Sequence, residues 1–478
     1  MKRTYYIAFL CLGLLTLSTH IGAQDVQRFA ERSPIGTARY VGMGGAMTAI
    51  GGDPSAALDN PAGLALYRHC EFSVSLDETI DQTMQNGGNY FYQRSRLMLP
   101  QASVVWASGN PDKQRGLIFS NFMLTINRLH SYNRDVSVSG NNFGLIPTIC
   151  TKTNLLPESQ LQNLPWNNED IGWLSILGYE GFLINPAAND QWVPALDLPS
   201  SSLEVHETGY SDQYTLSWAG NINNQWYLGA SLNIPNITYR KEMSLYQSNG
   251  LNNAELKSAF HASGVGVSGS FGVIGRPTQW LRLGISVHTP TALTLTVQTE
   301  GDIYSNINNN SYEVLTPASG AFEVKYASPL RTSASIAFQL KHLGLLSFQY
   351  DYAHALREKK TQYQPMEDVH TLRTGLEVQV CKGVFLNAGY VYESSFLNTD
   401  PIVELTYNTI RTDTDYRYTQ FSQYASAGIG YRSDFLVAHV AYQYGWQLLH
   451  QYATECHLYP IDVATNTHRI VATLAWRL

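Results

Sequence analysis

Residues 213–234, QYTLSWAGNINNQWYLGASLNI, place two alternating segments on either side of an Asn-Ile-Asn-Asn turn. Successive side chains of a β-strand point to opposite faces, so each segment has one apolar face and one mostly polar face. A transmembrane β-barrel needs this alternation, because one face of its wall meets lipid and the other a polar lumen. The stretch therefore predicts a hairpin of a membrane barrel. The apolar face of its second strand consists of Trp226, Leu228, Ala230, Leu232 and Ile234.

The same hairpin pattern recurs, with short turns expected at residues 276–279, 341–344, 381–384 and 432–435. Longer polar stretches separate the hairpins, at 240–260, 295–330, 356–370, 393–418 and 447–466. Short turns at one end and long loops at the other are typical of outer-membrane barrels, whose periplasmic turns are the short ones. Further segments at 69–76, 101–108, 116–126 and 469–478 complete an all-β fold, an antiparallel transmembrane barrel of about 14 strands within residues 69–478. A soluble β-sandwich is the alternative, but it does not require so regular an alternation of loop lengths.

Composition points the same way. Charged residues make up 14% of the chain and aromatic residues 12%, whereas soluble domains carry about 25% charged residues. A barrel tolerates this composition, because only every second residue of its wall must be apolar. The net charge of −7 and the lack of a basic run argue against a nucleic-acid partner.

The amino terminus has the pattern of a secretory signal peptide. Lys2 and Arg3 precede an apolar run at residues 5–17, and Ala23 ends a cleavage site of small residues. The run is shorter than the roughly 20 residues that a membrane anchor needs. We therefore predict a signal peptide at residues 1–23 and a mature chain that leaves the cytoplasm.

Residues 42–64, GMGGAMTAIGGDPSAALDNPAGL, precede the first expected strand. A dinucleotide-binding fingerprint would need a third glycine where Met47 stands, and a phosphate-binding loop would need a lysine, which is absent. Asp53 followed by Pro54 indicates the start of a short helix. Irregular backbone at membrane depth must be enclosed by protein, and small residues suit such close packing. We therefore predict a plug, or hatch, at residues 24–68.

Two stretches resemble the FadL/TodX (OMPP1) family of outer-membrane transport proteins. Residues 38–64, ARYVGMGGAMTAIGGDPSAALDNPAGL, resemble the hatch of that family, and residues 60–62 match its Asn-Pro-Ala motif. Residues 272–291, GVIGRPTQWLRLGISVHTPT, resemble a hairpin in the middle of its barrel. The resemblance covers essentially the whole mature chain. The hatch residues that we single out are Gly42, Gly44, Gly45, Asp53, Asn60, Pro61, Ala62 and Gly63.

This resemblance implies a transporter in the outer membrane of a Gram-negative bacterium, in contact with its lipid and inserted by the barrel-assembly machinery. We expect a monomer, because one closed barrel can enclose one path. The implied ligand is a hydrophobic small molecule, a long-chain fatty acid or an aromatic hydrocarbon. In the family, loops capture the ligand, the hatch shifts, and a kink in the third strand opens the wall into the bilayer. The third strand here, expected at residues 116–126, has no internal Pro or Gly, so Ser120–Asn121 is the expected break. Candidates for holding a carboxylate are Arg240, Lys241, Arg282 and Arg331.

A long insertion at about residues 130–212 does not fit the wall. Apolar residues recur near helical spacing within 170–184, which predicts a short amphipathic helix. The candidates for ligand capture are Leu174, Leu177 and Phe182. The alternative is a lid that packs over its own barrel.

Other functions remain open. The main alternative is a FadL-like barrel that serves protein secretion, with the insertion as a docking surface at the cell surface. No spacing singles out a catalytic set, a metal site or a cofactor site, so we predict no enzyme. The mature cysteines form no C-x-x-C pair. Cys381 is expected in a periplasmic turn and Cys150 and Cys456 in external loops, which excludes a bond between Cys381 and either of them and leaves a Cys150–Cys456 bond undecided.

Overall fold

The computed structural model describes residues 28–85, 91–110, 112–113, 115–318, 321–340, 343–354, 368–395, 410–457 and 459–478. The signal peptide predicted at residues 1–23 lies outside them. Within the described residues, no helix combines the length and the apolarity needed to cross a membrane.

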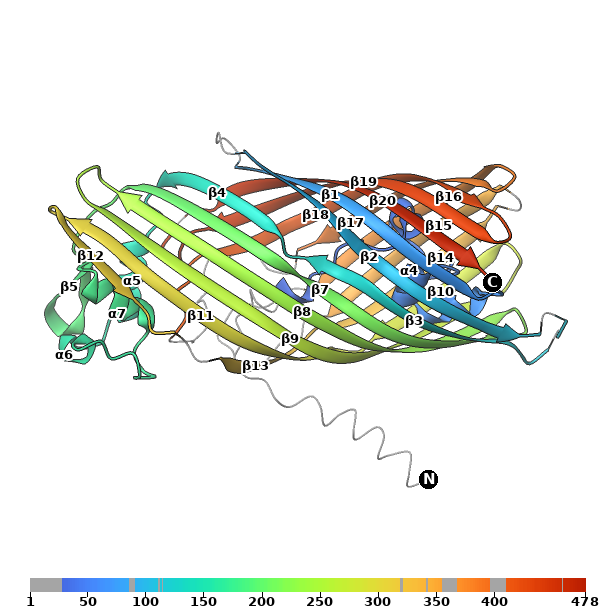
Figure 1. Cartoon of the computed structure of the whole chain (residues 1–478), viewed down its shortest axis with the longest axis horizontal. Helices are drawn as coiled ribbons and strands as arrows, with labels where there is room; N and C mark the ends of the chain where they lie inside the picture. The colour runs from blue at the N-terminus through green and yellow to red at the C-terminus, as the bar shows by residue number, and fades with distance from the viewer. Residues whose placement is uncertain are drawn as a thin grey trace, which may run out of the picture.

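Most of the described chain forms one antiparallel sheet (Figure 1). Its strands in chain order are β1 (Glu71–Gln85), β2 (Phe91–Gly109), β3 (Leu117–Ser131), β4 (Arg134–Asn141), β7 (Ser200–Ile222), β8 (Trp226–Ser248), β9 (Asn253–Gly275), β10 (Leu281–His288), β11 (Ala292–Ile307), β12 (Asn310–Leu315), β13 (Phe322–Ala327), β14 (Leu330–Gln339), β15 (Gly344–His354), β16 (Val369–Cys381), β17 (Val384–Ser394), β18 (Tyr416–Arg432), β19 (Leu436–Tyr452) and β20 (Ile461–Arg477).

The sheet closes on itself, because β1 pairs with β20 along its whole length, from Glu71 with Arg477 to Gln85 with Val463. Three positions in the wall are interrupted. β3 and β4 together form the third strand of the wall, β10 and β11 the seventh, and β12, β13 and β14 the eighth. The wall is thus a closed barrel of 14 strands, which confirms the predicted fold.

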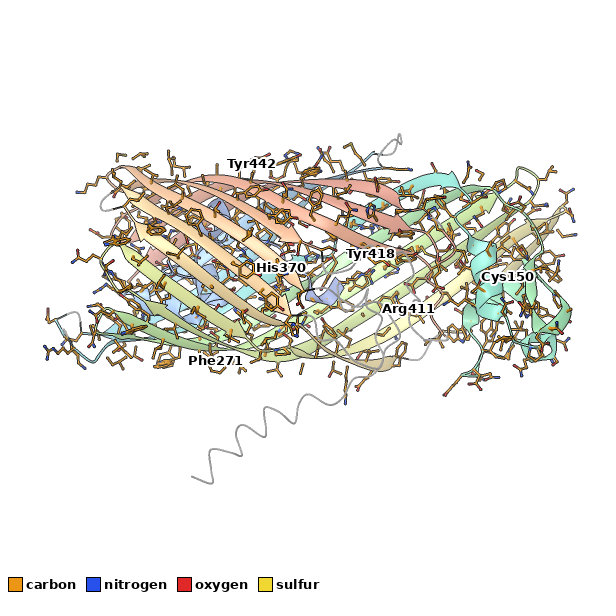
Figure 2. The ribbon with its side chains drawn as sticks, turned by 180° about the vertical axis from the view of Figure 1, so that it is seen from behind. Cys150, Phe271, His370, Arg411, Tyr418 and Tyr442 are labelled. Atoms are coloured by element: carbon orange, nitrogen blue, oxygen red, sulfur yellow. The ribbon has the colours of Figure 1, made fainter. Side chains whose placement is uncertain are left out.

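The side chains of the wall alternate as the sequence predicts. In β8, Trp226, Leu228 and Leu232 are exposed, whereas Tyr227 between them is buried. Figure 2 shows Tyr442 and Phe271 on the outer face of the wall. The turn between β7 and β8 holds Asn223 and Asn224 at φ values of 58° and 53°, the left-handed conformation of a tight hairpin turn.

Several strands run further outward than predicted. β8 and β9 continue through most of the loop expected at 240–260, with side chains still alternating. The outward residues there, such as Arg240 and Glu242, are polar because they lie beyond the lipid-facing band, and inward residues such as Met243 join an apolar core. The prediction of a loop was wrong because the lipid-facing pattern ends before the strand does.

Residues 142–199 leave the wall and form a cap at its outer end, at the left of Figure 1. The apolar core of the cap includes inward-facing residues of β7, β8 and β9, which fix it to the mouth of the barrel. α7 lies within the helix predicted at 170–184. The elements of the cap are α5 (Leu145–Thr153), α6 (Glu158–Leu161), α7 (Trp173–Glu180), β5 (Ile184–Pro186), η3 (Ala188–Asp190) and β6 (Trp192–Pro194).

The cysteines lie at opposite ends of the barrel. Cys381 ends β16 beside a short turn, whereas Cys150 is in α5 and Cys456 between β19 and β20. All four described cysteines are free. Burial and the nearby Cys456 raise the pKa of the Cys150 thiol to about 11.

Replacing Leu232 with Arg places a charge on the lipid-facing side of β8. We expect the substitution to lower the free energy of unfolding in lipid vesicles by about 2–4 kcal/mol, measured by urea titration. Ser244→Arg, on the same face but beyond the apolar band, is the matched control. Equal stability of the two variants would contradict the assignment of this face to lipid.

Candidate functional site

The hatch is built from three short helices, α3 (Ala38–Gly42), α4 (Pro54–Asp59) and η2 (Pro61–Leu66). Asp53 caps α4, since its carboxylate accepts from the backbone N–H of Ser55 at 2.9 Å. Asn60 caps η2 in the same way, accepting from the N–H of Ala62 at 3.0 Å. Its side-chain amide also donates to the carbonyl of Thr48 at 2.8 Å. The two caps fold the segment into a compact body.

Glycines let this body fold tightly. Gly51 has a φ of 63°, and a Cβ on Gly63 would lie 2.9 Å from its Cα. Gly44 and Gly45 also have positive φ values. All the hatch residues that the sequence singled out lie in this body and are buried. They are Gly42, Gly44, Gly45, Asp53, Asn60, Pro61, Ala62 and Gly63.

Several wall strands carry a glycine where they face the hatch. A Cβ on Gly375 would lie 2.5 Å from the carbonyl oxygen of Met43, and one on Gly284 equally close to that of Thr48. The hatch backbone therefore approaches the wall more closely than any larger residue allows. The sequence analysis did not identify these positions, because their glycines look like the small, polar face of a strand. A Cβ on Gly272 would instead meet the side chain of Asn60. The wall glycines that face hatch backbone in this way are Gly229, Gly284, Gly375 and Gly389.

Buried charges fix the hatch in place. Arg39 of α3 forms two hydrogen bonds with Glu377 of β16, Nε to Oε2 at 2.8 Å and Nη2 to Oε1 at 3.1 Å. Arg432 of β18 also pairs with Glu377, at 2.6 Å. Burial raises the pKa of Asp53, opposed by the charge of Arg39 and the hydrogen bond from Thr37. Such bidentate pairs are strong and geometrically specific, so the hatch has one seated position.

Above the hatch, the lumen holds a polar cavity of about 110 Å³. Six arginines and four carboxylates line it, together with His130. Most of these arginines have carboxylate partners. Arg417 lies 3.4 Å from Glu207, and Arg96 pairs with Asp81. The cavity is thus a charged space in which an apolar ligand would find little contact.

An apolar cluster of buried side chains lies beside this cavity, and Phe29 packs within it. The ring of Phe29 makes edge contacts with Tyr132 and Tyr239, at centroid distances of 6.2 Å and 5.8 Å. The pocket draws one or two residues from each of several strands, so no single stretch of sequence revealed it. We call this set the aromatic pocket: Tyr132, Ile237, Tyr239, Phe260, Leu293, Leu295, Val297 and Tyr326.

The wall is interrupted next to this pocket. β3 pairs with β2 only from Gln101 to Gly109, so residues 91–100 of β2 have no strand partner on that edge among the described residues. Arginines bridge the gap instead: Arg94 lies 3.2 Å from Asp135 of β4, and Arg96 donates to the carbonyl of Asn133 at 2.7 Å. The wall therefore has an opening that side chains close.

The prediction of a break at Ser120–Asn121 was wrong. Both residues are paired with β2 and β7. The third strand instead stops at Tyr132 and Asn133, between β3 and β4. Pro100 lies next to the last pair of β2 with β3, and proline in a strand marks an edge or a bulge. Pro100 was therefore the residue in the sequence that indicated where the pairing of β2 with β3 ends.

The structure separates the predicted capture residues. Leu174 and Leu177 are 7% and 0% exposed in the core of the cap, where they stabilise its fold. Phe182 is 55% exposed and packs against Tyr312 of β12. Among these three residues, Phe182 alone offers its ring to the surface. A role in capture stays a prediction for it.

The predicted basic residues have separate partners. Arg240 is on the outer face, 2.7 Å from Glu242. Arg282 donates to the carbonyl of Ile50 at 3.1 Å, and Arg331 to that of Ala30 at 2.6 Å. Lys241 is buried between two aspartates. No group of three or more metal-ligating side chains occurs in the part of the chain that the structure describes.

Replacing Gly389 with Ala would put a Cβ against the backbone nitrogen of Gly44. We expect this overlap to unseat the hatch and to lower the free energy of unfolding by about 1–3 kcal/mol, with a higher ion conductance in planar bilayers. Gly269→Ala is the matched control, because its Cβ would come no closer than 3.7 Å to a neighbouring atom. A Gly389→Ala protein with control-like stability and conductance would refute the close fit.

Comparisons with known proteins agree with this geometry. The toluene transporter TodX of Pseudomonas putida matches with a TM-score of 0.50 at 13% identity, over 94% of this chain and 99% of that one. A FadL homologue of Pseudomonas aeruginosa matches with a TM-score of 0.52 at 13% identity, over 93% of this chain and 98% of that one. No family model and no curated protein matches the sequence. The chain has the fold of the FadL and TodX channels, integral β-barrels of the Gram-negative outer membrane.

Proposed function

We propose that the barrel passes hydrophobic small molecules across the outer membrane, with long-chain fatty acids and aromatic hydrocarbons as the ligand classes. The observation that carries the proposal is the aromatic pocket, an apolar site in the lumen next to the polar cavity. Burying a CH₂ group is worth about 0.8 kcal/mol, so an apolar ligand in the lumen gains most at this pocket. A ligand takes the place of Phe29.

The path then leaves through the wall. Beneath the pocket the hatch is seated by buried ion pairs, whereas beside it the edge of β2 has no strand partner among the described residues. Tyr92 and Asp135 line both the luminal cavity and a groove that also includes the exposed side chains of Glu204 and Glu242. A sideways exit spares an apolar ligand the seated hatch and the aqueous periplasm.

The architecture of the cap favours a second candidate, an interaction protein that docks exported proteins. The cap has its own apolar core and exposes Leu155 and Phe182. Co-purification of secreted proteins with the barrel, lost on Leu155→Ser, would support this role.

Replacing Phe29 with Ala empties the aromatic pocket. We expect the variant to bind a naphthalene fluorophore about tenfold more tightly than the unaltered protein does, because the competing ring is gone; this is about 1.4 kcal/mol. Binding is measured by fluorescence titration of purified barrel. Phe435→Ala removes an exposed ring from the short turn between β18 and β19 and should leave this affinity unchanged.

A charge introduced into the pocket should have the opposite effect on ligand binding to Phe29→Ala. We expect Leu295→Asp to abolish binding of the fluorophore while the barrel still shows its folded, heat-modifiable migration. Uptake of a labelled fatty acid by cells should fall with it. If Leu295→Asp binds the fluorophore as tightly as the unaltered protein, and Phe29→Ala binds it no more tightly, the aromatic pocket is not the ligand site.

A further inference from the structure

A short segment between β17 and β18, residues 410–415, turns into the lumen. Thr412, Asp413, Thr414 and Asp415 are all buried. None of the six residues belongs to a strand, so side chains rather than a backbone ladder hold the segment. We call residues 410–415 the strap. Figure 2 shows its Arg411 in the half of the barrel toward the cap, which carries Cys150.

Hydroxyl groups attach the strap to the wall. The Thr412 hydroxyl lies 2.8 Å from that of Ser258 in β9 and donates to the carbonyl of Glu300 in β11 at 3.1 Å. Thr414 donates to the carbonyl of Ala453 at 2.8 Å. These contacts span the lumen, because β9 and β11 lie on one side and Ala453, after β19, on another.

The main anchor is a buried lysine. Lys241 of β8 is 1% exposed, and its Nζ lies 2.6 Å from Asp413 Oδ2 and 2.7 Å from Asp415 Oδ1. Arg411 also binds Asp413, through Nε at 2.8 Å and Nη2 at 2.7 Å. A buried charge is tolerated when it is paired and is costly when its partner is lost. Lys241 therefore specifies where the strap sits.

The charges also keep the strap ionised. Burial acts to raise the pKa of Asp413, but the charges of Arg411 and Lys241 outweigh it and lower the pKa. With Asp415, one lysine and one arginine then face two carboxylates. The strap is thus held by charge pairs that can separate without breaking a strand of the wall.

The strap lies between the aromatic pocket and the core of the cap. On one side, the Arg411 guanidinium stacks over the ring of Phe260 in the aromatic pocket, 4.4 Å from its centroid. On the other, the Thr414 hydroxyl lies 3.9 Å from the sulfur of Met243, which belongs to the core of the cap. Any path from the cap to the aromatic pocket on this side meets the strap.

We propose that the strap is a movable barrier over the outer side of the aromatic pocket, and that separation of Asp413 and Asp415 from Lys241 opens the pocket to the cell exterior. The pairs are local, so their separation breaks no strand pairing of the wall. The closed state seen here excludes solvent from Ser258, which the open state exposes. This inference does not depend on which ligand the barrel carries.

Labelling of a cysteine at position 258 tests the barrier without a ligand. In a background with the four mature cysteines replaced by Ser, Ser258→Cys in cells should react slowly with a membrane-impermeant maleimide. Adding Lys241→Met should speed labelling at least tenfold. Lys257→Met, which removes an exposed lysine of β9, is the matched control and should not speed it.

Two further sets of substitutions test the barrier if Lys241→Met does not fold. Asp413→Asn with Asp415→Asn should speed labelling in the same way. Thr412→Cys with Ser258→Cys, joined by an added oxidant, should slow entry of the fluorophore into the pocket at least tenfold, and reduction should restore it. Ser217→Cys with Ser231→Cys, whose native hydroxyls are 2.7 Å apart on neighbouring strands, is the control bond.

The outcomes separate the strap from the ligand. Fast labelling in the charge variants supports the barrier even if no hydrophobic ligand binds, a result that would count against the proposed function alone. Folded charge variants that label as slowly as Ser258→Cys by itself would overturn the barrier. So would unchanged fluorophore entry with the strap bonded to β9.

Discussion

Backbone hydrogen bonding at the depth of the bilayer constrains the whole molecule. Lipid offers no partner to a backbone N–H or C=O, so only a closed wall is stable there. β1 and β20 therefore pair along their full length, and the irregular backbone of the hatch is enclosed by the barrel and bonded to it through the N–H groups of Ala38 and Thr48. One edge departs from this rule. Residues 91–100 of β2 have no strand partner on the side of β3 among the described residues, and arginine side chains take the place of backbone hydrogen bonds there. The departure lies beside the aromatic pocket, which makes it the natural place for a path through the wall.

The lumen divides into regions of different chemistry. The hatch region combines a glycine fit with a bidentate ion pair and forms a rigid seal. Above it, paired arginines and carboxylates favour water and ions over apolar molecules. The aromatic pocket is an apolar cluster beside this polar space, and Phe29 and Arg411 of the strap pack against its rings. On the proposed function, a ligand displaces these parts of the protein to reach it.

The sequence revealed features that local patterns encode. Alternation in residues 213–234 predicted the barrel, and Asp53 followed by Pro54 predicted the start of α4 in the hatch. Sequence patterns did not predict the features that form where segments distant in the chain meet. Phe29 follows no periodicity, and its pocket collects single residues from separate strands. The wall glycines mattered through the backbone that they approach, which lies hundreds of residues away. Leu174 and Leu177 had the right spacing for a helix, but spacing does not distinguish a face that packs inward from one that meets a ligand.

The account depends on a hatch that stays seated while ligand leaves through the wall. A Cβ on Gly42 would lie 3.4 Å from that of Ala441 in β19, close to the separation in a disulfide. We would bond Gly42→Cys to Ala441→Cys in a background without the four mature cysteines and measure uptake of a labelled fatty acid by cells before and after reduction. The account predicts that uptake continues with the hatch bonded to the wall. Uptake that stops on oxidation and returns on reduction would show that the ligand passes through the hatch, and would contradict it.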